Sequence, residues 1–333
     1  MSAWSPHSQQ SDRTASVGVV IPTRGRRSLT AAVRSALDQT YAPTSVVIVV
    51  DGPLELVKDI PLPDDSRLQV ISDLPKSGVS EARNAGIRHL DSDLVSLLDD
   101  DDEWMPTKLE RQVAAYRDAR ARGVIHPIIA CRALIQDERG IKKRVQPIDV
   151  IQPGQRVGDY LFGRRRVFPG GAMLGSSMLL FDSALAGATP FLDSARQHED
   201  WDWLIRATAR EDTVIFQLKD QLMRKTQHRG QASRHPGGVQ ASIIWILASG
   251  EWLTATEQAN FILCEVAARP LRNRDVQQYL SLIRLARRVG TPNAKAWIAA
   301  TVGLLAFALF DHATVGFGRA KLAVRSNRRR RNR

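Results

Sequence analysis

Residues 94–104 read LVSLLDDDDEW, a short apolar run that passes directly into five acidic side chains and a tryptophan. The run at 94–98 is typical of a strand that is buried on both faces of a parallel sheet. Adjacent carboxylates repel one another and are costly to bury, so residues 99–103 belong at the edge of the core. Ligands of open α/β sheets bind beyond the carboxyl ends of the strands. We therefore expect these acids to lie in a ligand crevice.

The rest of the first half of the chain alternates between apolar runs and helical patterns. Strands are expected at 17–22, 45–50 and 68–72, and helices follow Ser28 and Pro106. Such alternation predicts parallel strands that are joined by right-handed crossovers. The expected fold is α/β, with a Rossmann-like, mostly parallel central sheet flanked by helices. A helical C-terminal extension follows it.

Composition and charge describe an ordinary folded chain with an unusual end. The chain has 333 residues, 43% of them apolar and 25% charged, and its formal net charge is +12. Residues 319–333 hold eight arginines and lysines and no acid, so the remainder carries only +4. Cys131 and Cys264 have no CxxC spacing, which argues against a disulfide framework or a structural zinc site. The first sixteen residues lack a long apolar run, so we expect no secretory signal and a cytoplasmic protein.

The acidic run has two interpretations from the residues alone. It can be a solvated turn in which Asp102 caps the helix that starts near Pro106. It can also hold a divalent cation, because Mg²⁺ and Mn²⁺ take carboxylate oxygens together with phosphate oxygens. Thr23 and Asp51 follow other strands, so they are expected at the same edge of the sheet. The sequence has no G-x-G-x-x-G and no P-loop motif, which disfavours those two classes of nucleotide site.

Several segments together resemble a family 2 glycosyltransferase of the GT-A fold over roughly residues 16–235. They occur in the family's order: VVIPTRGR (19–26), SALDQTY (35–41), VVIVVDG (46–52), SGVSEARNAGI (77–87), LVSLLDDDDEWMPTKLE (94–110), GSSMLLF (175–181), HEDWDWLIRAT (198–208) and LMRKTQHRGQAS (222–233). The resemblance implies transfer of a sugar from a nucleoside-diphosphate sugar, most commonly UDP-linked, to a hydroxyl with inversion. It also implies Mn²⁺ or Mg²⁺ as the cofactor and a saccharide or lipid-linked acceptor. Many relatives carry two adjacent aspartates where this chain has Asp51 and Gly52.

The resemblance also assigns roles to residues. Asp101 is the expected direct metal ligand, Asp99 a ribose or water-mediated contact, and His228 a further metal or diphosphate contact. In the second acidic cluster Asp200 is the expected catalytic base, because the attacking hydroxyl must give up its proton. Glu199 is expected to bind acceptor or sugar hydroxyls, and Trp201 to stack on a sugar. The expected nucleotide-sugar contacts are Pro22, Thr23, Arg24, Asp51, Arg83, Asp99, Asp100 and Asp101.

Each of these residues also has a purely structural interpretation. Acids at 199–202 interact favourably with the dipole of the helix expected at 198–209. Tryptophans such as Trp201 are most often core residues, and a lone arginine such as Arg83 is most often on the surface. Strands are further expected at 177–181 and 214–218.

We divide the chain into a disordered N-terminal tail (1–15), a catalytic domain (16–235), a helical C-terminal region (236–312) and a basic tail (313–333). Residues 296–310 are fifteen uncharged residues, fewer than the roughly 20 that a membrane span needs. This segment can be a buried helix, or it can lie at a membrane surface. For the tail we expect peripheral contact with an anionic membrane on its cytoplasmic face rather than nucleic-acid binding. The alternatives to sugar transfer are a sugar-phosphate nucleotidyltransferase and a non-catalytic scaffold that acts through its basic tail.

Overall fold

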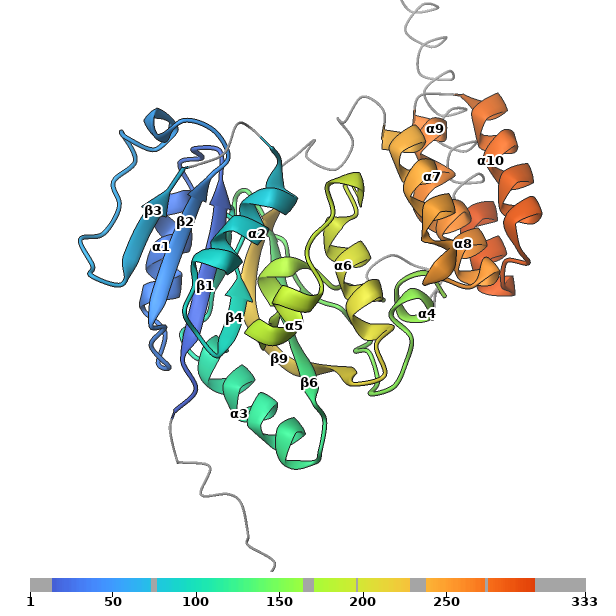
Figure 1. Cartoon of the computed structure of the whole chain (residues 1–333). Coiled ribbons are helices and arrows are strands. Elements are labelled where there is room, and N and C mark those ends of the chain that lie inside the picture. The colour runs from blue at the N-terminus through green and yellow to red at the C-terminus, as the bar shows by residue number, and fades with distance from the viewer. Residues whose placement is uncertain are drawn as a thin grey trace, which may run out of the picture.

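A computed structural model describes residues 14–72, 77–163, 171–195, 197–227, 238–272 and 275–302. Its centre is a nine-stranded sheet with the order β3-β2-β1-β4-β8-β6-β9-β5, and β7 pairs with β6 (Figure 1). The strands are β1 (Val17–Thr23), β2 (Ser45–Val50), β3 (Leu68–Ile71), β4 (Leu94–Leu97), β5 (Asp102–Trp104), β6 (His126–Asp137), β7 (Lys143–Gln146), β8 (Leu180–Asp182) and β9 (Thr213–Gln227). The helices are α1 (Leu29–Leu37), α2 (Val79–His89), α3 (Lys108–Ala121), α4 (Val157–Phe162), α5 (Ser183–Ala188), α6 (Glu199–Thr208), α7 (Gly238–Ala248), α8 (Ala255–Phe261), α9 (Ala268–Arg272) and α10 (Val276–Val289).

The first half of the sheet is parallel, as expected. β1 pairs in parallel with β2 and β4, and β2 pairs in parallel with β3. The apolar runs are buried on both faces, and Val46 and Val47 are each fully covered although their side chains point to opposite sides. The carboxyl ends of β1, β2 and β4 therefore meet at one edge, which brings the residues that follow them together.

The second half of the sheet is mixed. β8 is antiparallel to β4 and β6, whereas β9 is parallel to β6 and antiparallel to β5. The strand expected at 177–181 is wrong in its first part, because residues 176–178 form a single 3₁₀ turn before β8. The hydroxyls of Ser176 and Ser177 bond the side chain and the backbone N–H of Asp99, and these bonds hold the chain in the turn. β9 begins one residue before the expected 214–218 and extends nine residues beyond it, to Gln227.

Asp102 does not cap a helix, which corrects one interpretation of the acidic run. It lies in β5, where it pairs with Lys225 of β9. The following helix, α3, begins at Lys108, and the backbone N–H of Leu109 donates to Oε1 of Gln39 at 3.0 Å. A glutamine just past the end of α1 thus satisfies one buried N–H of the first turn of α3. Ser28 does occupy the position before α1, but its side chain makes no capping hydrogen bond.

Helices cover both faces of the sheet. The apolar faces of α1 and α3 join one core, through residues such as Val33 and Val113. α2, α5 and α6 contribute to the opposite core, which contains Ala82, Leu185 and Trp203 (Figure 1). This second core continues without a break from Phe162 of α4 into the C-terminal helices. It includes Trp245 of α7, Phe261 of α8 and Tyr279 of α10.

The C-terminal part is helical, as expected, from Gly238 to the last described residue at 302. None of the helices within the described ranges is long and apolar enough to cross a membrane. Residues 303–310, the basic tail at 313–333 and the N-terminal residues 1–13 lie outside the described part, so the predictions made for them stay predictions.

Candidate active site

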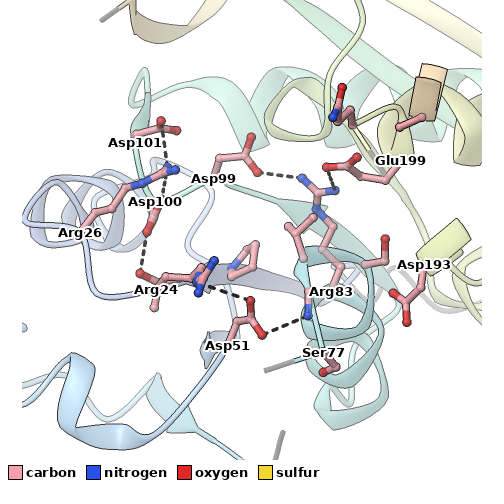
Figure 2. Close-up of a pocket in the computed structure, with 17 residues that line it drawn as sticks. Arg24, Arg26, Asp51, Ser77, Arg83, Asp99, Asp100, Asp101, Asp193 and Glu199 are labelled. Carbon is pink, nitrogen blue, oxygen red and sulfur yellow. Dashed lines mark hydrogen bonds and ion pairs between the residues drawn. The ribbon is translucent and has the colours of Figure 1, made fainter. Parts of the chain in front are cut away.

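A cavity of about 770 Å³ opens at the carboxyl edge of β1, β2 and β4, beside the first turn of α2 (Figure 2). Nine of the residues that the sequence predicted line it: Pro22, Thr23, Arg24, Asp51, Arg83, Asp99, Asp100, Asp101 and Glu199. The sequence did not predict the remaining lining residues, which are Arg26, Ser77, Gly78, Val79, Ser80, Asp193, Gln197 and Ala241. Five of the predicted residues are acidic and come from three separate segments, so tertiary folding brings them to one cavity.

Asp51 forms the floor at the end of β2. Its side chain is buried, and Oδ1 accepts a hydrogen bond from the backbone N–H of Gly78 at 3.1 Å. Gly78 has a φ of +98°, which a residue with a Cβ rarely adopts. Arg24 lies on the other side, with Nε 3.8 Å from Oδ2 of Asp51. The carboxylate is thus fixed between the loop after β1 and the start of α2.

Asp100 joins two loops instead of facing the cavity freely. Thr23 Oγ1 donates to its Oδ2 at 2.6 Å, and Arg26 Nη1 donates to its Oδ1 at 2.8 Å. Burial raises the pKa of Asp100, and the bonds from Thr23 and Arg26 oppose that rise only in part. Asp100 therefore ties the loop after β1 to the acidic run.

Three carboxylates form a cluster that can hold a cation. Oxygen atoms of Asp99, Asp101 and Asp102 all lie within 4.8 Å of one another. The sequence predicted roles for Asp99 and Asp101 in this site but interpreted Asp102 as a possible helix cap. The position of Asp102 depends on the pairing of β5 with β9, which the sequence did not predict. In that strand Asp102 lies close to Asp99 and Asp101. His228, the third expected metal contact, lies outside the described residues.

Asp102 is held by a lysine that the sequence reasoning did not assign. Lys225 Nζ lies 3.0 Å from both carboxylate oxygens of Asp102. Burial raises the pKa of Asp102 to about 7, although Lys225 opposes the rise. Burial would lower the pKa of Lys225, but the three carboxylates together raise it above its usual value.

Arg83 is the centre of the site. Its side chain is only 2% exposed, and Nη2 donates to Asp99 Oδ1 at 2.9 Å and to Ser176 Oγ at 2.9 Å. Nη1 lies 2.9 Å from Asp200 Oδ1. It also lies 3.9 Å from Glu199 Oε1 (Figure 2). Burial opposes the charge, but the carboxylates of Asp200, Asp99 and Glu199 raise the pKa of Arg83.

The position of Arg83 depends on close packing of α2. A Cβ on Gly86 would come within 2.9 Å of Val49 Cγ2 and closer still to Val20, so only glycine lets the helix approach the sheet this closely. The next turn of α2 toward its N-terminus carries Arg83, whose guanidinium then reaches both acidic clusters.

The second acidic cluster begins α6. Asp200 Oδ2 accepts the backbone N–H of Ser176 at 3.0 Å, so this carboxylate is held from two sides. Asp200 does not line the cavity itself, whereas its neighbour Glu199 does. Burial and the charge of Asp200 raise the pKa of Glu199 to about 6, and Arg83 opposes the rise.

Trp201 lies among aromatic side chains and not along the cavity wall. Its ring meets Phe162 edge-on at 5.6 Å, and its indole N–H donates to the carbonyl of Leu174 at 3.1 Å. His198 stacks on it at 5.4 Å. This placement matches the structural interpretation of the residue, and its contact with a sugar stays a prediction.

The fold that carries this site is of the GT-A type. The crystal structure of S. aureus TarS superposes with a TM-score of 0.53 and 14% identity. The match covers 88% of this chain and 54% of that chain, and at this identity it shows a shared fold alone.

Sequence comparison then gives the family. Residues 18–180 match the family model described as glycosyl transferase family 2, so this part of the chain is a glycosyltransferase domain of that family. The amylovoran biosynthesis glycosyltransferase AmsB of Erwinia amylovora is 25% identical over 279 residues, which cover 81% of this chain and 89% of AmsB. The glucosyltransferase WfgD of Escherichia coli is 27% identical over 100 residues, 29% of this chain and 40% of WfgD. The family argues against the nucleotidyltransferase and scaffold alternatives.

Proposed function

We propose that the protein transfers a sugar from a UDP-linked donor to a hydroxyl of a saccharide or lipid-linked acceptor, with inversion, in polysaccharide or glycolipid synthesis. The relative WfgD is described as acting on UDP-Glc and a diphosphoundecaprenol-linked acceptor, and AmsB as acting in amylovoran biosynthesis. The observation that carries the proposal is the link through Arg83, which joins Asp99 at the acidic cluster to Asp200.

The nucleoside part of the donor is proposed to bind against the loop after β1 and the end of β2. Asp51 offers a fixed carboxylate that accepts hydrogen bonds from a base or a ribose. Pro22, Thr23 and Arg24 line the same wall of the cavity. A volume of about 770 Å³ falls within the range of small-molecule sites, roughly 300–1,000 Å³.

The acidic cluster fits Mn²⁺ or Mg²⁺. Asp99, Asp101 and Asp102 supply three carboxylate oxygens close together, the ligand type that hard divalent cations prefer. Lys225 Nζ lies 3.0 Å from Asp102, and Arg26 Nη1 lies 3.0 Å from Asp101. These two side chains therefore compensate the negative charge that a bound metal ion would also compensate. A bound divalent ion would neutralise negative charge on the leaving diphosphate.

Asp200 is proposed as the base. Its carboxylate is fixed by Arg83 and by the Ser176 N–H, so its orientation is set before the acceptor arrives. It would take the proton of the acceptor hydroxyl as that oxygen attacks the anomeric carbon, and UDP would leave from the opposite face. A single displacement of this kind inverts the anomeric centre. Glu199 lines the cavity beside it and would bind sugar or acceptor hydroxyls.

Arg83 is proposed to organise the site more than to grip the diphosphate. In the described arrangement its guanidinium is 2% exposed and engaged with carboxylates from α6 and from the acidic run. The rigid guanidinium of Arg83 thus sets the distance between Asp99, at the proposed donor site, and Asp200, the proposed base.

The test is release of UDP from a panel of UDP-sugars in the presence and absence of Mn²⁺. Slow metal-dependent hydrolysis of one donor is expected without acceptor, with water taking the place of the acceptor hydroxyl. Thermal unfolding with each donor and Mn²⁺ provides an independent reading of binding. A protein that neither binds nor hydrolyses any UDP-sugar, while binding other nucleotides, would refute the proposed donor class.

A further inference from the structure

The hairpin that connects β6 to β7 has an exposed surface that the proposed chemistry does not use. Asp137 Oδ1 accepts the backbone N–H groups of Ile141 at 2.8 Å and Lys142 at 3.2 Å. Gly140 takes a φ of +66°, which completes the turn. The tip is thus a fixed structure, and the side chains on it are held outward.

Large apolar side chains on this hairpin point to solvent. Ile141 at the tip is 73% exposed, and Val145 and Ile148 farther along are 37% and 46% exposed. Single exposed apolar residues are ordinary on protein surfaces, but here three fall within eight residues, Ile141 and Val145 on the hairpin and Ile148 just after β7.

Four cationic side chains are interleaved with these apolar residues, namely Arg139, Lys142, Lys143 and Arg144, against one acid between 138 and 148. All four are exposed. Within the described ranges none of them forms an ion pair with a carboxylate, although Arg144 donates to the amide oxygen of Gln227 at 3.0 Å. Their charge is therefore available to an external anion.

The register of the sheet places this hairpin beside the acidic cluster. Asp102 pairs with Lys225, and Lys225 pairs with Ile135, so Ile135 lies two strands away from Asp102 at the same level. Neighbouring strands are separated by about 4.8 Å, which puts Ile135 about 10 Å from Asp102. The hairpin begins two residues beyond Ile135, past the edge of the sheet at which the cavity opens.

We propose that the β6–β7 hairpin is a membrane-docking element that inserts Ile141 into the headgroup region of an anionic bilayer while the four cations contact lipid phosphates. Basic residues interleaved with exposed apolar side chains have this chemistry. A nucleic acid would use the cations but has no apolar layer for Ile141. Docking would present a membrane-embedded acceptor next to the site. That last consequence depends on the proposed function, whereas the docking itself is measured without any turnover.

The experiment reads the environment of the hairpin directly in the full chain, so the C-terminal basic residues cannot produce the signal. Ile141→Cys is labelled with the polarity-sensitive fluorophore NBD in a Cys264→Ser background. Cys131 is fully buried, and its burial raises the pKa of its thiol to about 11, so it does not compete for label. We expect a blue shift and stronger emission with phosphatidylglycerol-containing vesicles, and no change with pure phosphatidylcholine.

The matched label site is Ala121→Cys, an exposed position at the end of α3 that precedes the opposite end of β6. No shift is expected there. A shift of the same size at both sites, or no shift at 141 under conditions in which the protein pellets with the vesicles, overturns the proposal.

A charge-reversal variant tests the cations in the same labelled chain. Lys142→Glu, Lys143→Glu and Arg144→Glu together are expected to raise the half-saturating lipid concentration more than about tenfold. Arg117→Glu, Arg120→Glu and Arg122→Glu, at the C-terminal end of α3, make the same charge change at exposed positions that precede the opposite end of β6. Less than about a twofold effect is expected there. Equal effects of the two triple variants, or a tight complex with a nucleic acid and none with vesicles, would also overturn the proposal. UDP release without acceptor should be the same in both variants, so a failure of docking is distinct from a failure of the donor chemistry.

Discussion

Nη1 of Arg83 lies 2.9 Å from Oδ1 of Asp200, while Nη2 of the same guanidinium lies 2.9 Å from Oδ1 of Asp99. Asp99 and Asp200 are a hundred residues apart in the sequence, and one side chain from α2 fixes their separation. Ser176 strengthens the link, because its hydroxyl donates to Asp99 Oδ1 at 3.1 Å and its backbone N–H donates to Asp200 Oδ2. The donor side and the proposed base are therefore one connected network.

Replacing Arg83 should damage stability and activity together. Arg83→Gln removes the positive charge from among three carboxylates, and loss of one partner of a buried ion pair typically costs about 3–5 kcal/mol. We expect a drop of that order in the free energy of unfolding, measured by urea denaturation. Arg83→Lys keeps the positive charge but lacks the planar guanidinium that reaches two carboxylates at once. Compared with Arg83→Gln, it should therefore have higher stability but similarly low turnover. If Arg83→Gln unfolds with the same free energy as wild type, the ion pairs of Arg83 do not contribute to stability.

Asp200→Asn should separate chemistry from donor binding. The amide keeps the size of the side chain but cannot take a proton, and general-base catalysis is typically worth about 10²–10⁴-fold. We expect transfer to the acceptor to fall within that range, while the dissociation constant for the donor, measured by calorimetry, stays the same. Asp202→Asn is the matched control, because Asp202 lies on the same helix but bonds Arg206 and Trp245 instead of Arg83 and Ser176. Near-normal turnover of the Asp200 variant would exclude the residue as the base.

Two adjacent aspartates should have different roles. Asp101→Ala is expected to abolish Mn²⁺-dependent donor binding, because Asp101 belongs to the carboxylate cluster. Asp100→Asn should retain that binding but lower stability by about 1–3 kcal/mol, since the side chain bonds Thr23 and Arg26. Calorimetric titration with Mn²⁺ and the donor, together with thermal unfolding, distinguishes the two. Identical outcomes for both variants would argue against the division of roles.

The stability of the protein should rise with pH because of Lys108. This lysine is fully buried, and its amine donates to Ser96 Oγ at 3.0 Å and to Gln112 Oε1 at 2.7 Å. Among the residues that the structure describes, no carboxylate forms an ion pair with it. Burial lowers its pKa from 10.5 to about 7. Between these values the unfolded chain binds more protons than the folded chain, so the free energy of unfolding increases with pH, at up to about 1.4 kcal/mol per pH unit.

Lys108→Met removes this contribution. Between pH 7 and pH 9 we expect wild type to gain about 2 kcal/mol relative to Lys108→Met in urea denaturation. The same substitution at Lys58, which is exposed, should leave the pH dependence unchanged. Parallel pH profiles of wild type and Lys108→Met would show that Lys108 is neutral or charged equally in both states.

Much of the site was predictable because it follows strand ends. Apolar runs at β1, β2 and β4 predict parallel strands, and parallel strands bring the residues after them to one edge. This reasoning placed Thr23, Asp51 and Asp99 at the cavity correctly. The helix that begins with Glu199 was also visible, since acids concentrate in a first turn.

Other features of the site came only from contacts between distant segments. Nothing in the sequence around Asp102 shows that β9 will pair with β5, and a run of aspartates before a proline resembles a helix cap equally well. Lys225 was therefore not assigned. Arg83 was expected in the crevice, but its partners lie on α6 and on the acidic run, and only packing of α2 through Gly86 brings them together.

By itself, the sequence determined the fold class, the edge of the sheet that carries the acids, and the family, because each depends on local periodicity and on motifs in order along the chain. The tertiary structure decided which acids face one another and which cations compensate them. It did so because ion pairs and cation sites depend on distances of a few ångströms between side chains from different elements, and those distances are set by strand register and helix packing.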